Sequence, residues 1–348
     1  MKNMKELSGA YPEELAAEMA ALSEKPFRAG QVFAWLQKGA SFDEMTNLSR
    51  ELREKLKAAY VDQPVQLLEK RVSQVDDTVK VLYSLRDGNC VEGVIMHYHY
   101  GYTLCISTQV GCAMGCRFCA STLEGCVRNL TAAEMLGQIH CANALLKEKN
   151  DRIGHVVLMG SGEPLANMQE VVRFLRLVSH PQGLNIGIRH ISLSTCGLVP
   201  RIYEFADEHL PVTLSLSLHA PNDRIRRQLM PIAERYSIRE TLEACEYYLR
   251  QTGRRLIIEY ALVDGVNADR SCAEELSKLL RGIQCHVNLI PLNQVPERHL
   301  FGVQETQVQA FLNVLEKNHI SATRRREMGD DIQGACGQLR KRHLEGLA

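Results

Sequence analysis

The chain has 348 residues, with 41 lysines and arginines against 41 aspartates and glutamates, so its formal net charge is zero. This length fits one large domain plus a small one, and the balanced charge neither requires nor excludes a polyanionic partner. No stretch approaches the roughly 20 apolar residues of a membrane span, and the opening residues carry no secretory pattern. We therefore expect a cytoplasmic protein without a membrane partner. Among its 12 cysteines, the clustered thiols then serve metal binding or catalysis rather than structural disulfides, and core packing explains the scattered ones.

Residues 10–60 carry apolar side chains at intervals of three and four, which is typical of amphipathic helices. The helical stretches read "PEELAAEMAALS", "RAGQVFAWLQKG" and "NLSRELREKLKAAY", with "SFDEMTN" as a polar break. They predict a small helical accessory domain over residues 1–62. Residues 78–100 then form two alternating runs joined by a turn that contains Gly88, which predicts a β-hairpin in a linker over residues 63–100.

Residues 101–348 alternate short apolar runs with longer helical patterns. The runs with strand character are residues 102–108, 155–161, 190–197, 212–220, 256–263 and 286–293. Six such units in a row predict a parallel sheet covered by helices. The fold class is therefore α/β, and an open (β/α)6 barrel fits the pattern better than a doubly wound sheet. In such barrels the chemistry gathers at the C-terminal ends of the strands.

Three cysteines are closely spaced on a loop after the first of these strands. Cys112, Cys116 and Cys119 follow the pattern C-x3-C-x2-C, with the aromatic Phe118 before the last of them. Structural zinc sites and ferredoxin-type clusters take four protein ligands, so three thiolates predict an iron with an open coordination position. Zinc with Cys126 or a histidine as the fourth ligand, and unliganded core thiols, are the alternatives.

This cysteine pattern after the first strand of a β/α barrel resembles the radical S-adenosylmethionine (SAM) superfamily. The resemblance implies a 4Fe-4S cluster on Cys112, Cys116 and Cys119 whose fourth iron binds SAM. The "GSGEPLAN" segment supplies Gly162 and Glu163, which resemble the superfamily's Gly-Glu pair beside the SAM ammonium. The other residues implied to contact SAM lie at the ends of later strands and are Ser194, Ser217, Leu218, His219 and Asn293.

Within that superfamily the chain resembles the RlmN/Cfr family of RNA adenine methyltransferases over almost its whole length. The segments that carry the resemblance are "FRAGQVFAWLQKG", "QVGCAMGCRFCAST", "RNLTAAE", "SLHAPND", "CHVNLIPLN" and "GDDIQGACGQL". The family match makes Cys336 the methyl carrier, Cys105 the thiol that later forms a transient disulfide with it, and Glu92 the proton acceptor. Two SAM molecules are then used per turnover, one to methylate Cys336 and one to generate the 5′-deoxyadenosyl radical.

The resemblance implies methylation at C2 of an adenine in the peptidyl-transferase loop of 23S rRNA and of an adenine 3′ to the tRNA anticodon. It also implies an RNA-binding accessory domain, an electron donor such as flavodoxin, and a monomer. Methylation at C8 of the same rRNA adenine is the nearest alternative. A radical SAM activase that acts on a protein, and a zinc-stabilised RNA-binding protein, are the alternatives from other classes.

Three residues depart from the family pattern. Separately, three basic runs either bind phosphate or form solvated surface. The departures are Ser161, Cys196 and Ala233, and the sequence before "GDDIQG" also differs from the usual one. Of the three, Ala233 stands where the family usually has an Asn, so SAM or RNA positioning could change there. The basic runs are Arg224–Gln228, Arg324–Arg326 and Arg340–His343, any of which could contact an RNA backbone.

Overall fold

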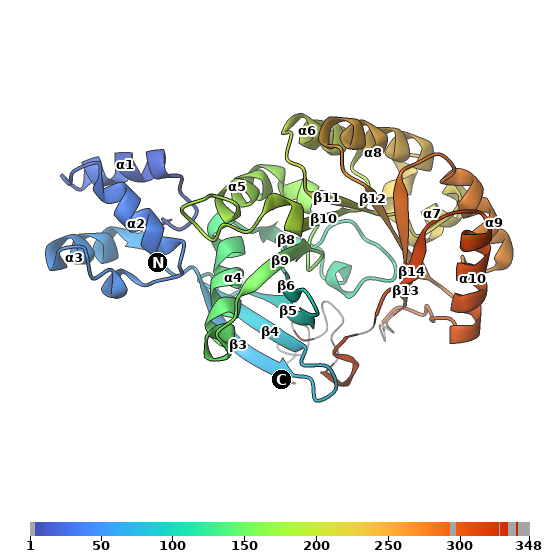
Figure 1. Ribbon diagram of the computed structural model, residues 1–348, viewed down its shortest axis with the longest axis horizontal. Coiled ribbons are helices and arrows are strands. Elements are labelled where there is room, and N and C mark those ends of the chain that lie inside the picture. The colour runs from blue at the N-terminus through green and yellow to red at the C-terminus, as the bar shows by residue number, and fades with distance from the viewer. Residues whose placement is uncertain (1–3, 293–296, 327, 333–338, 340–348) are drawn as a thin grey trace.

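A ten-stranded sheet forms the centre of the computed structural model, which describes residues 4–292, 297–326, 328–332 and 339. The strand order is β14-β13-β12-β11-β10-β9-β6-β5-β4-β3. Seven adjacent strands, from β6 to β14, run parallel to one another. They curve into an open barrel (Figure 1). This confirms the predicted fold class.

The six predicted strands of the barrel are all present. They are β6 (Gly101–Cys105), β9 (Ile153–Leu158), β10 (Ile191–Thr195), β11 (Thr213–Ser217), β12 (Leu256–Leu262) and β13 (Cys285–Pro291). A seventh parallel strand, β14 (Ala322–Arg324), extends the edge beyond β13. It was not predicted, because three residues are too few to show a periodic pattern.

Helices cover the outer face of the barrel (Figure 1). They are α4 (Ala132–Leu146), α5 (Met168–Val178), α6 (Val199–Asp207), α7 (Asp223–Leu229), α8 (Ile238–Thr252), α9 (Arg270–Leu279) and α10 (Glu305–Lys317). In β13, Val287 and Leu289 are fully buried in the main core, whereas the alternate residues His286 and Asn288 are only half-buried. This alternation leaves polar side chains on the other face of the strand.

An antiparallel extension continues the same sheet beyond β6. Strands β4 (Val79–Leu85) and β5 (Cys90–Tyr98) form the predicted hairpin, and β5 pairs with β6. Strand β3 (Val65–Val72), at the outer edge, was not predicted. Its sequence VQLLEKRV lacks clean alternation, and a register shift lies between Leu67 and Glu69. Most of its side chains are exposed, so burial imposes no binary pattern on it.

A helical unit precedes the sheet and lies at one end of the molecule, beside α4 and α5 (Figure 1). Its helices are α1 (Pro12–Ala21), α2 (Arg28–Leu36) and α3 (Arg50–Ala59), as the sequence predicts. A two-stranded sheet of β1 (Lys5–Glu6) and β2 (Tyr60–Val61) closes the unit, and it was not predicted. Arg173 of α5 donates two hydrogen bonds, of 2.6 and 2.9 Å, to the carboxylate of Glu14 in α1.

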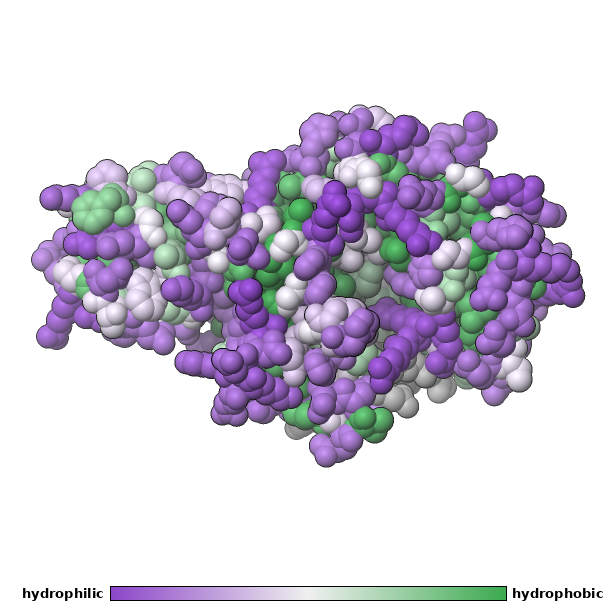
Figure 2. Space-filling model, viewed as in Figure 1, coloured by the Kyte–Doolittle hydropathy of each residue, from purple (hydrophilic) through white to green (hydrophobic). Residues whose placement is uncertain are grey.

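The molecular surface is mostly hydrophilic on the face shown in Figure 2. Apolar side chains appear there as separate patches between charged ones. Within the described part of the chain, no helix has both the length and the apolar character that a membrane crossing requires.

Candidate active site

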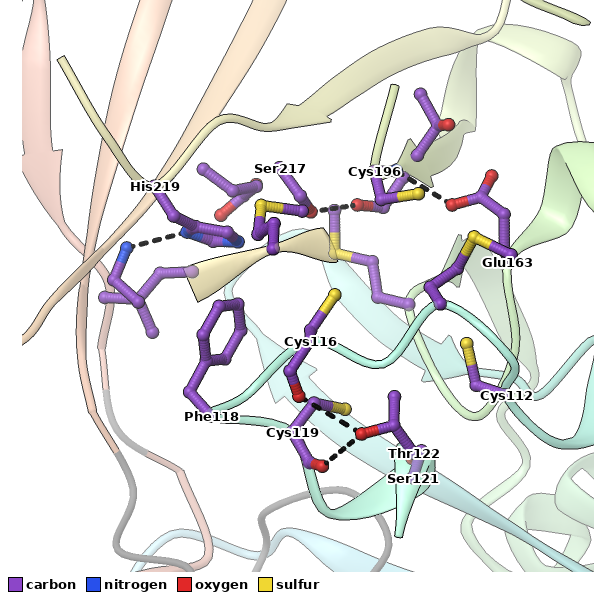
Figure 3. Close-up of a pocket in the computed structure, with 18 of the residues that line it drawn as sticks. Cys112, Cys116, Phe118, Cys119, Ser121, Thr122, Glu163, Cys196, Ser217 and His219 are labelled. Atoms are coloured by element: carbon purple, nitrogen blue, oxygen red, sulfur yellow. Dashed lines mark hydrogen bonds between the residues drawn. The ribbon is translucent and has the colours of Figure 1, made fainter. Parts of the chain in front are cut away.

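A pocket of about 270 Å³ lies at the C-terminal ends of the parallel strands (Figure 3). This is the end of the barrel at which the sequence placed the chemistry. Among the residues that line it are Cys112, Cys116, Cys119, Phe118, Gly162, Glu163, Ser194, Cys196, Ser217, His219, Glu259 and Arg325. Its walls thus combine thiols, carboxylates and hydroxyls with apolar and aromatic surface, as ligand pockets commonly do.

The loop that carries the three predicted cysteines begins at a short antiparallel ribbon. The ribbon consists of β7 (Gln109–Gly111) and β8 (Cys126–Asn129). Gly111 has a φ of +76°, and a Cβ there would lie 2.0 Å from the carbonyl oxygen of Gly125, so only glycine fits. At the other end, the Thr122 hydroxyl donates to the carbonyls of Cys116 and Cys119 at 3.1 and 2.9 Å. These contacts fix the curvature of the loop.

The three thiols surround the pocket rather than converge on one point (Figure 3). Within the ranges that the structure describes, no group of three or more His, Cys, Asp or Glu residues is close enough to hold a single metal ion. Cys126, the fourth ligand in the zinc interpretation, does not line the pocket. Thiols around a wider space fit a polynuclear cluster, which distributes its ligands over several iron atoms.

Burial changes the ionisation of these thiols. It raises the pKa of Cys112 to about 12, and it raises the pKa of Cys116 still further from its ordinary value. Without metal both side chains therefore carry a proton at neutral pH. Iron binding must displace those protons, because thiolate is the form that ligates metal.

Gly162 and Glu163 follow β9, and the backbone there is tightly constrained. Gly162 has a φ of +112°, and a Cβ at this position would lie 2.7 Å from the Cβ of Gln109. The amide oxygen of Gln109 accepts a hydrogen bond of 2.8 Å from the Glu163 backbone N–H. The Glu163 carboxylate accepts from the backbone N–H groups of Leu165 and Cys196, at 3.1 and 2.7 Å. Burial raises the pKa of this carboxyl, while those hydrogen bonds oppose the rise.

Ser217 and His219 approach the pocket from the end of β11 (Figure 3), and Ser194 of β10 also lines it. The hydroxyls of Ser194 and Ser217 are 3.3 Å apart. His219 Nδ1 accepts a hydrogen bond of 2.9 Å from the Ala261 N–H, and burial lowers the pKa of the imidazole to about 3. The ring is therefore neutral with its proton on Nε2, and it packs edge-on against Phe118 with ring centroids 4.7 Å apart.

Two of the predicted SAM contacts are not among the described residues that line the pocket. Leu218 is fully buried and does not line the pocket, although the sequence grouped it with its neighbours. Its N–H donates to the Glu259 carbonyl at 3.1 Å, and its own carbonyl accepts from Arg226 at 3.3 Å. Asn293 lies outside the described residues.

Cys105 and Glu92 lie on one face of the sheet beside the pocket. Cys105 in β6 pairs directly with Val94 in β5, and Glu92 is two residues before Val94, so both side chains leave the same face. Cys105 belongs to one buried cluster with Val94 and Met96, and Met159, which also lines the pocket, packs against that cluster. This face thus continues into the pocket wall.

Cys336 lies outside the described residues. Residues that precede and follow it in the chain do pack on the face that carries Cys105 and Glu92. Met328 contacts the cluster of Val94, Met96 and Cys105, and Leu339 contacts Leu82 and Cys90.

The sequence interpretation missed Glu259, and it considered Arg325 only as part of a basic run; both residues line the pocket. Glu259 is buried in β12, where its Oε1 accepts a 3.2 Å hydrogen bond from Asn288, while its Oε2 has no hydrogen-bond partner among the described residues. Burial raises the pKa of Glu259, and the positive charge of Arg325 opposes the rise. A single carboxylate inside the apolar run "LIIEYALV" was the available signal, since buried acids are rare outside functional sites.

The basic run at residues 224–228 is not exposed along its whole length. Arg226 is fully buried and donates to the carbonyls of Cys196, Leu218 and Ser217 at 2.7, 3.3 and 3.4 Å. It joins the ends of β10 and β11 beneath the pocket. Its neighbours Arg224 and Arg227 are exposed.

The three family departures are all buried. Cys196 lines the pocket, and its N–H donates a hydrogen bond to the Glu163 carboxylate. The Ser161 carbonyl accepts from the N–H groups of Thr108 and Gln109, while its hydroxyl has no hydrogen-bond partner within the described part of the chain. Nothing in the structure explains Ala233.

Comparison with known proteins agrees with the barrel and the pocket. Residues 106–274 match the Radical SAM superfamily, and residues 5–61 match the ribosomal RNA large subunit methyltransferase N-terminal domain. A radical SAM methyltransferase from Sphaerobacter thermophilus superposes with a TM-score of 0.93 at 40% identity, covering 96% of this chain and 98% of that one. The chain is thus a radical SAM protein, and its cofactors are a 4Fe-4S cluster and SAM.

Curated relatives define the family within that class. The probable dual-specificity RNA methyltransferase RlmN of Alkaliphilus metalliredigens is 51% identical, covering 96% of this chain and 94% of its own length. That of Clostridium novyi is 49% identical, covering 98% and 99%. The chain therefore belongs to the RlmN family of radical SAM RNA methyltransferases, which confirms the resemblance inferred from its motifs.

Proposed function

We propose that this enzyme methylates C2 of an adenine in 23S rRNA and of an adenine 3′ to the anticodon of tRNA. Its relatives are named for a dual specificity, and the chain aligns with them over nearly their full length. The class of substrate, RNA, follows from the family. The choice of C2 and of both RNAs is the part that needs testing.

Cys112, Cys116 and Cys119 would ligate the 4Fe-4S cluster, because their thiols surround the pocket. Glu163 would accept hydrogen bonds from the SAM ammonium, which favours its ionised form. Gly162, Ser194, Ser217 and neutral His219 would line the rest of that site. Leu218 and Asn293 remain predicted contacts from the family pattern.

Held by these residues, the cluster and SAM would supply the methyl group, the abstraction of a hydrogen atom from an S-methyl group, and the later removal of one electron from the RNA adduct. The thiolate of Cys336 would first take a methyl group from one SAM, which leaves as S-adenosylhomocysteine. After the loss of one hydrogen atom, the carbon on the Cys336 sulfur would bond to the adenine ring. Glu92 takes the ring proton from the carbon that was attacked.

Cys105 would complete the cycle by releasing the product. Its thiolate attacks the Cys336 sulfur, an S–S bond forms, and the bond from that sulfur to the new carbon breaks. The electron pair of the broken bond passes to the carbon, which gains a proton and becomes the methyl group. An external reductant then restores both thiols.

One observation carries this proposal. The sheet face that holds Cys105 and Glu92 adjoins the pocket through Met159, and chain segments before and after Cys336 pack on that same face. A general radical SAM activase has no need for a thiol and a carboxylate beside its pocket on a face where Met328 and Leu339 also pack. The arrangement therefore favours transfer through cysteine.

The test is the Cys105→Ala variant, incubated with SAM, a reductant and labelled rRNA or tRNA fragments. Methylation of Cys336 and addition to the ring need no Cys105, so the reaction should stop as a covalent protein-RNA adduct. The bond is a thioether, so the shifted band on a denaturing gel should survive thiol treatment. Cys141→Ala, a half-buried thiol of α4 away from the pocket, is the matched control and should turn over normally.

The Cys105→Ala, Cys336→Ala double variant should give no adduct. Nucleoside mass spectrometry of RNA methylated by the unaltered enzyme should give 2-methyladenosine from both substrates. Normal turnover by Cys105→Ala would overturn the mechanism, whereas 8-methyladenosine would overturn only the choice of ring carbon.

A further inference from the structure

A buried lysine reaches the predicted proton acceptor. Lys80 lies on β4 and Glu92 on the neighbouring strand β5, and the Lys80 ammonium is 3.3 Å from Glu92 Oε2. The side chain of Lys80 has no exposed surface, and that of Glu92 is 6% exposed. Leu82 pairs directly with Glu92 and Val94 with Lys80, so the ion pair runs diagonally across the two strands.

Burial gives this contact more weight than a surface ion pair has. A lysine is almost never fully buried unless it is paired. Removing one partner of a buried ion pair is costly, because it leaves the other charge buried and uncompensated. Lys80 and Glu92 therefore hold each other in place.

A hydrogen-bond network fixes the backbone at Glu92. The Glu92 carbonyl accepts a 2.8 Å hydrogen bond from the Ser107 hydroxyl. The Ser107 N–H in turn donates to the Gln138 amide oxygen at 2.9 Å, and the Gln138 amide donates to the Ser107 carbonyl at 3.0 Å. Strand β5 is therefore fixed at Glu92 by the segment that follows β6.

We propose that Lys80 is a positioning residue that orients Glu92 as the base of the methyl-transfer cycle. The inference rests on the proposed role of Glu92, and it adds a second residue to that role. Lys80 does not itself touch the RNA. It acts through the carboxylate.

Other charged or ionisable groups share this side of the strands. They are Glu69 and Arg71 on β3, Cys90 and Tyr98 on β5, Cys105 on β6, and Arg325 and Arg326, whose positive charges act on Tyr98. Glu69 and Arg71 pair with each other at 2.7 Å. Burial raises the pKa of Tyr98, so the phenol is neutral near pH 7. The contact between Lys80 and Glu92 is the one that carries the inference.

The variant Lys80→Met removes the charge and keeps the length of the side chain, whereas Lys80→Arg keeps the charge. A positioned base contributes on the order of 100-fold or more, so RNA methylation by Lys80→Met at pH 7 should fall by at least about tenfold. Lys80→Arg should retain most of the RNA methylation activity of the unaltered enzyme. Methylation of Cys336, measured by protein mass spectrometry, should be unchanged in both, since that step needs no base on Glu92.

The methylation of Cys336 separates loss of the positioned carboxylate from damage to the fold. Lys70→Met, at a surface lysine of β3, is the matched control and should leave RNA methylation unchanged. If Lys80→Met lost Cys336 methylation and RNA methylation to the same extent, the inference would be overturned.

Comparison with Glu92→Gln distinguishes the two proposals. If Lys80 acts through Glu92, the Lys80→Met, Glu92→Gln double variant should be no slower than Glu92→Gln alone. Losses that multiply would overturn the inference about Lys80. Full activity of Glu92→Gln would instead show that the proposed base is wrong.

Discussion

Individual residues differ in how far their roles can be predicted from the sequence. The cluster cysteines can be recognised from spacing alone, because three thiols within eight residues of one loop are typical of a shared inorganic centre. Lys80 and Glu259 are single charged residues in apolar strands, and a sequence cannot tell which partner a buried charge will meet. Only the register between β4 and β5 brings Lys80 to Glu92. Such contacts follow from tertiary pairing, which local patterns do not encode.

Gly162→Ala tests the geometry of the pocket at the scale of one methyl group. A Cβ would lie 2.7 Å from Gln109, and the φ of +112° is strained for any L side chain. Gln109 would have to move, and with it the hydrogen bond that holds Glu163. We expect SAM affinity to fall by about tenfold or more, equivalent to at least about 1.4 kcal/mol. Equilibrium binding of SAM measures this.

Gly154→Ala is the matched control for that variant. Gly154 lies on the same strand, β9, and a Cβ there meets no atom within 4 Å. Its SAM affinity should equal that of the unaltered protein. Equal affinities for both variants would mean that Gln109 and Glu163 have no part in SAM binding.

At the scale of elements, the sequence predicted those strands and helices whose burial imposes a pattern. The six barrel strands are apolar runs bounded by turns, and the three N-terminal helices have apolar stripes. Strands β1, β2 and β14 have two or three residues each, and β3 is largely exposed. Their pairing depends on neighbours distant in the sequence, so no local signal marks them.

Arg226→Met tests how the ends of two barrel strands are held together. Arg226 joins the carbonyls of Cys196 and Leu218 beneath the pocket, and burial lowers the pKa of its guanidinium. Removing it relieves the cost of a buried charge but leaves buried carbonyls without a donor, at about 1–3 kcal/mol each. The net change should be a loss of about 1–2 kcal/mol in the free energy of unfolding, with weaker SAM binding.

Denaturant unfolding and SAM titration measure those two effects. Arg224→Met, two residues away on the same helix and exposed, should change neither quantity. An Arg226→Met variant that is as stable as its parent and binds SAM equally well would contradict this role for the guanidinium.

At the scale of the whole molecule, the helical unit and the barrel share one continuous core. Leu15 and Phe33 of the helical unit belong to the same buried cluster as Leu136 of α4. Polar contacts cross the same junction: the Thr131 hydroxyl donates to Glu6, and His140 Nε2 lies 3.2 Å from the Gln37 carbonyl. The sequence indicated a separate accessory domain but did not indicate how that domain packs on the barrel, because interdomain contacts produce no periodic pattern of apolar residues.

His140 makes this junction sensitive to acid. Its ring donates to the Gln37 carbonyl, and burial lowers the pKa of the imidazole to about 4, against an ordinary value near 6.5. The unfolded chain therefore binds a proton below pH 6.5 that the folded protein refuses until about pH 4. Stability should thus be complete above pH 6.5 and fall as the pH drops from there towards 4. At pH 5.5 this one group should lower the free energy of unfolding by about 1.4 kcal/mol relative to pH 7.5.

His140→Gln keeps a side-chain N–H for the Gln37 carbonyl but removes the titration. Its free energy of unfolding should therefore fall less than that of the parent between pH 7.5 and 5.5, by about 1.4 kcal/mol. Denaturant melts of both proteins at the two pH values provide the comparison. His99→Gln, at an exposed histidine in the β5–β6 turn, should follow the parent. If His140→Gln lost as much stability as the parent on acidification, the junction would owe its acid sensitivity to other groups.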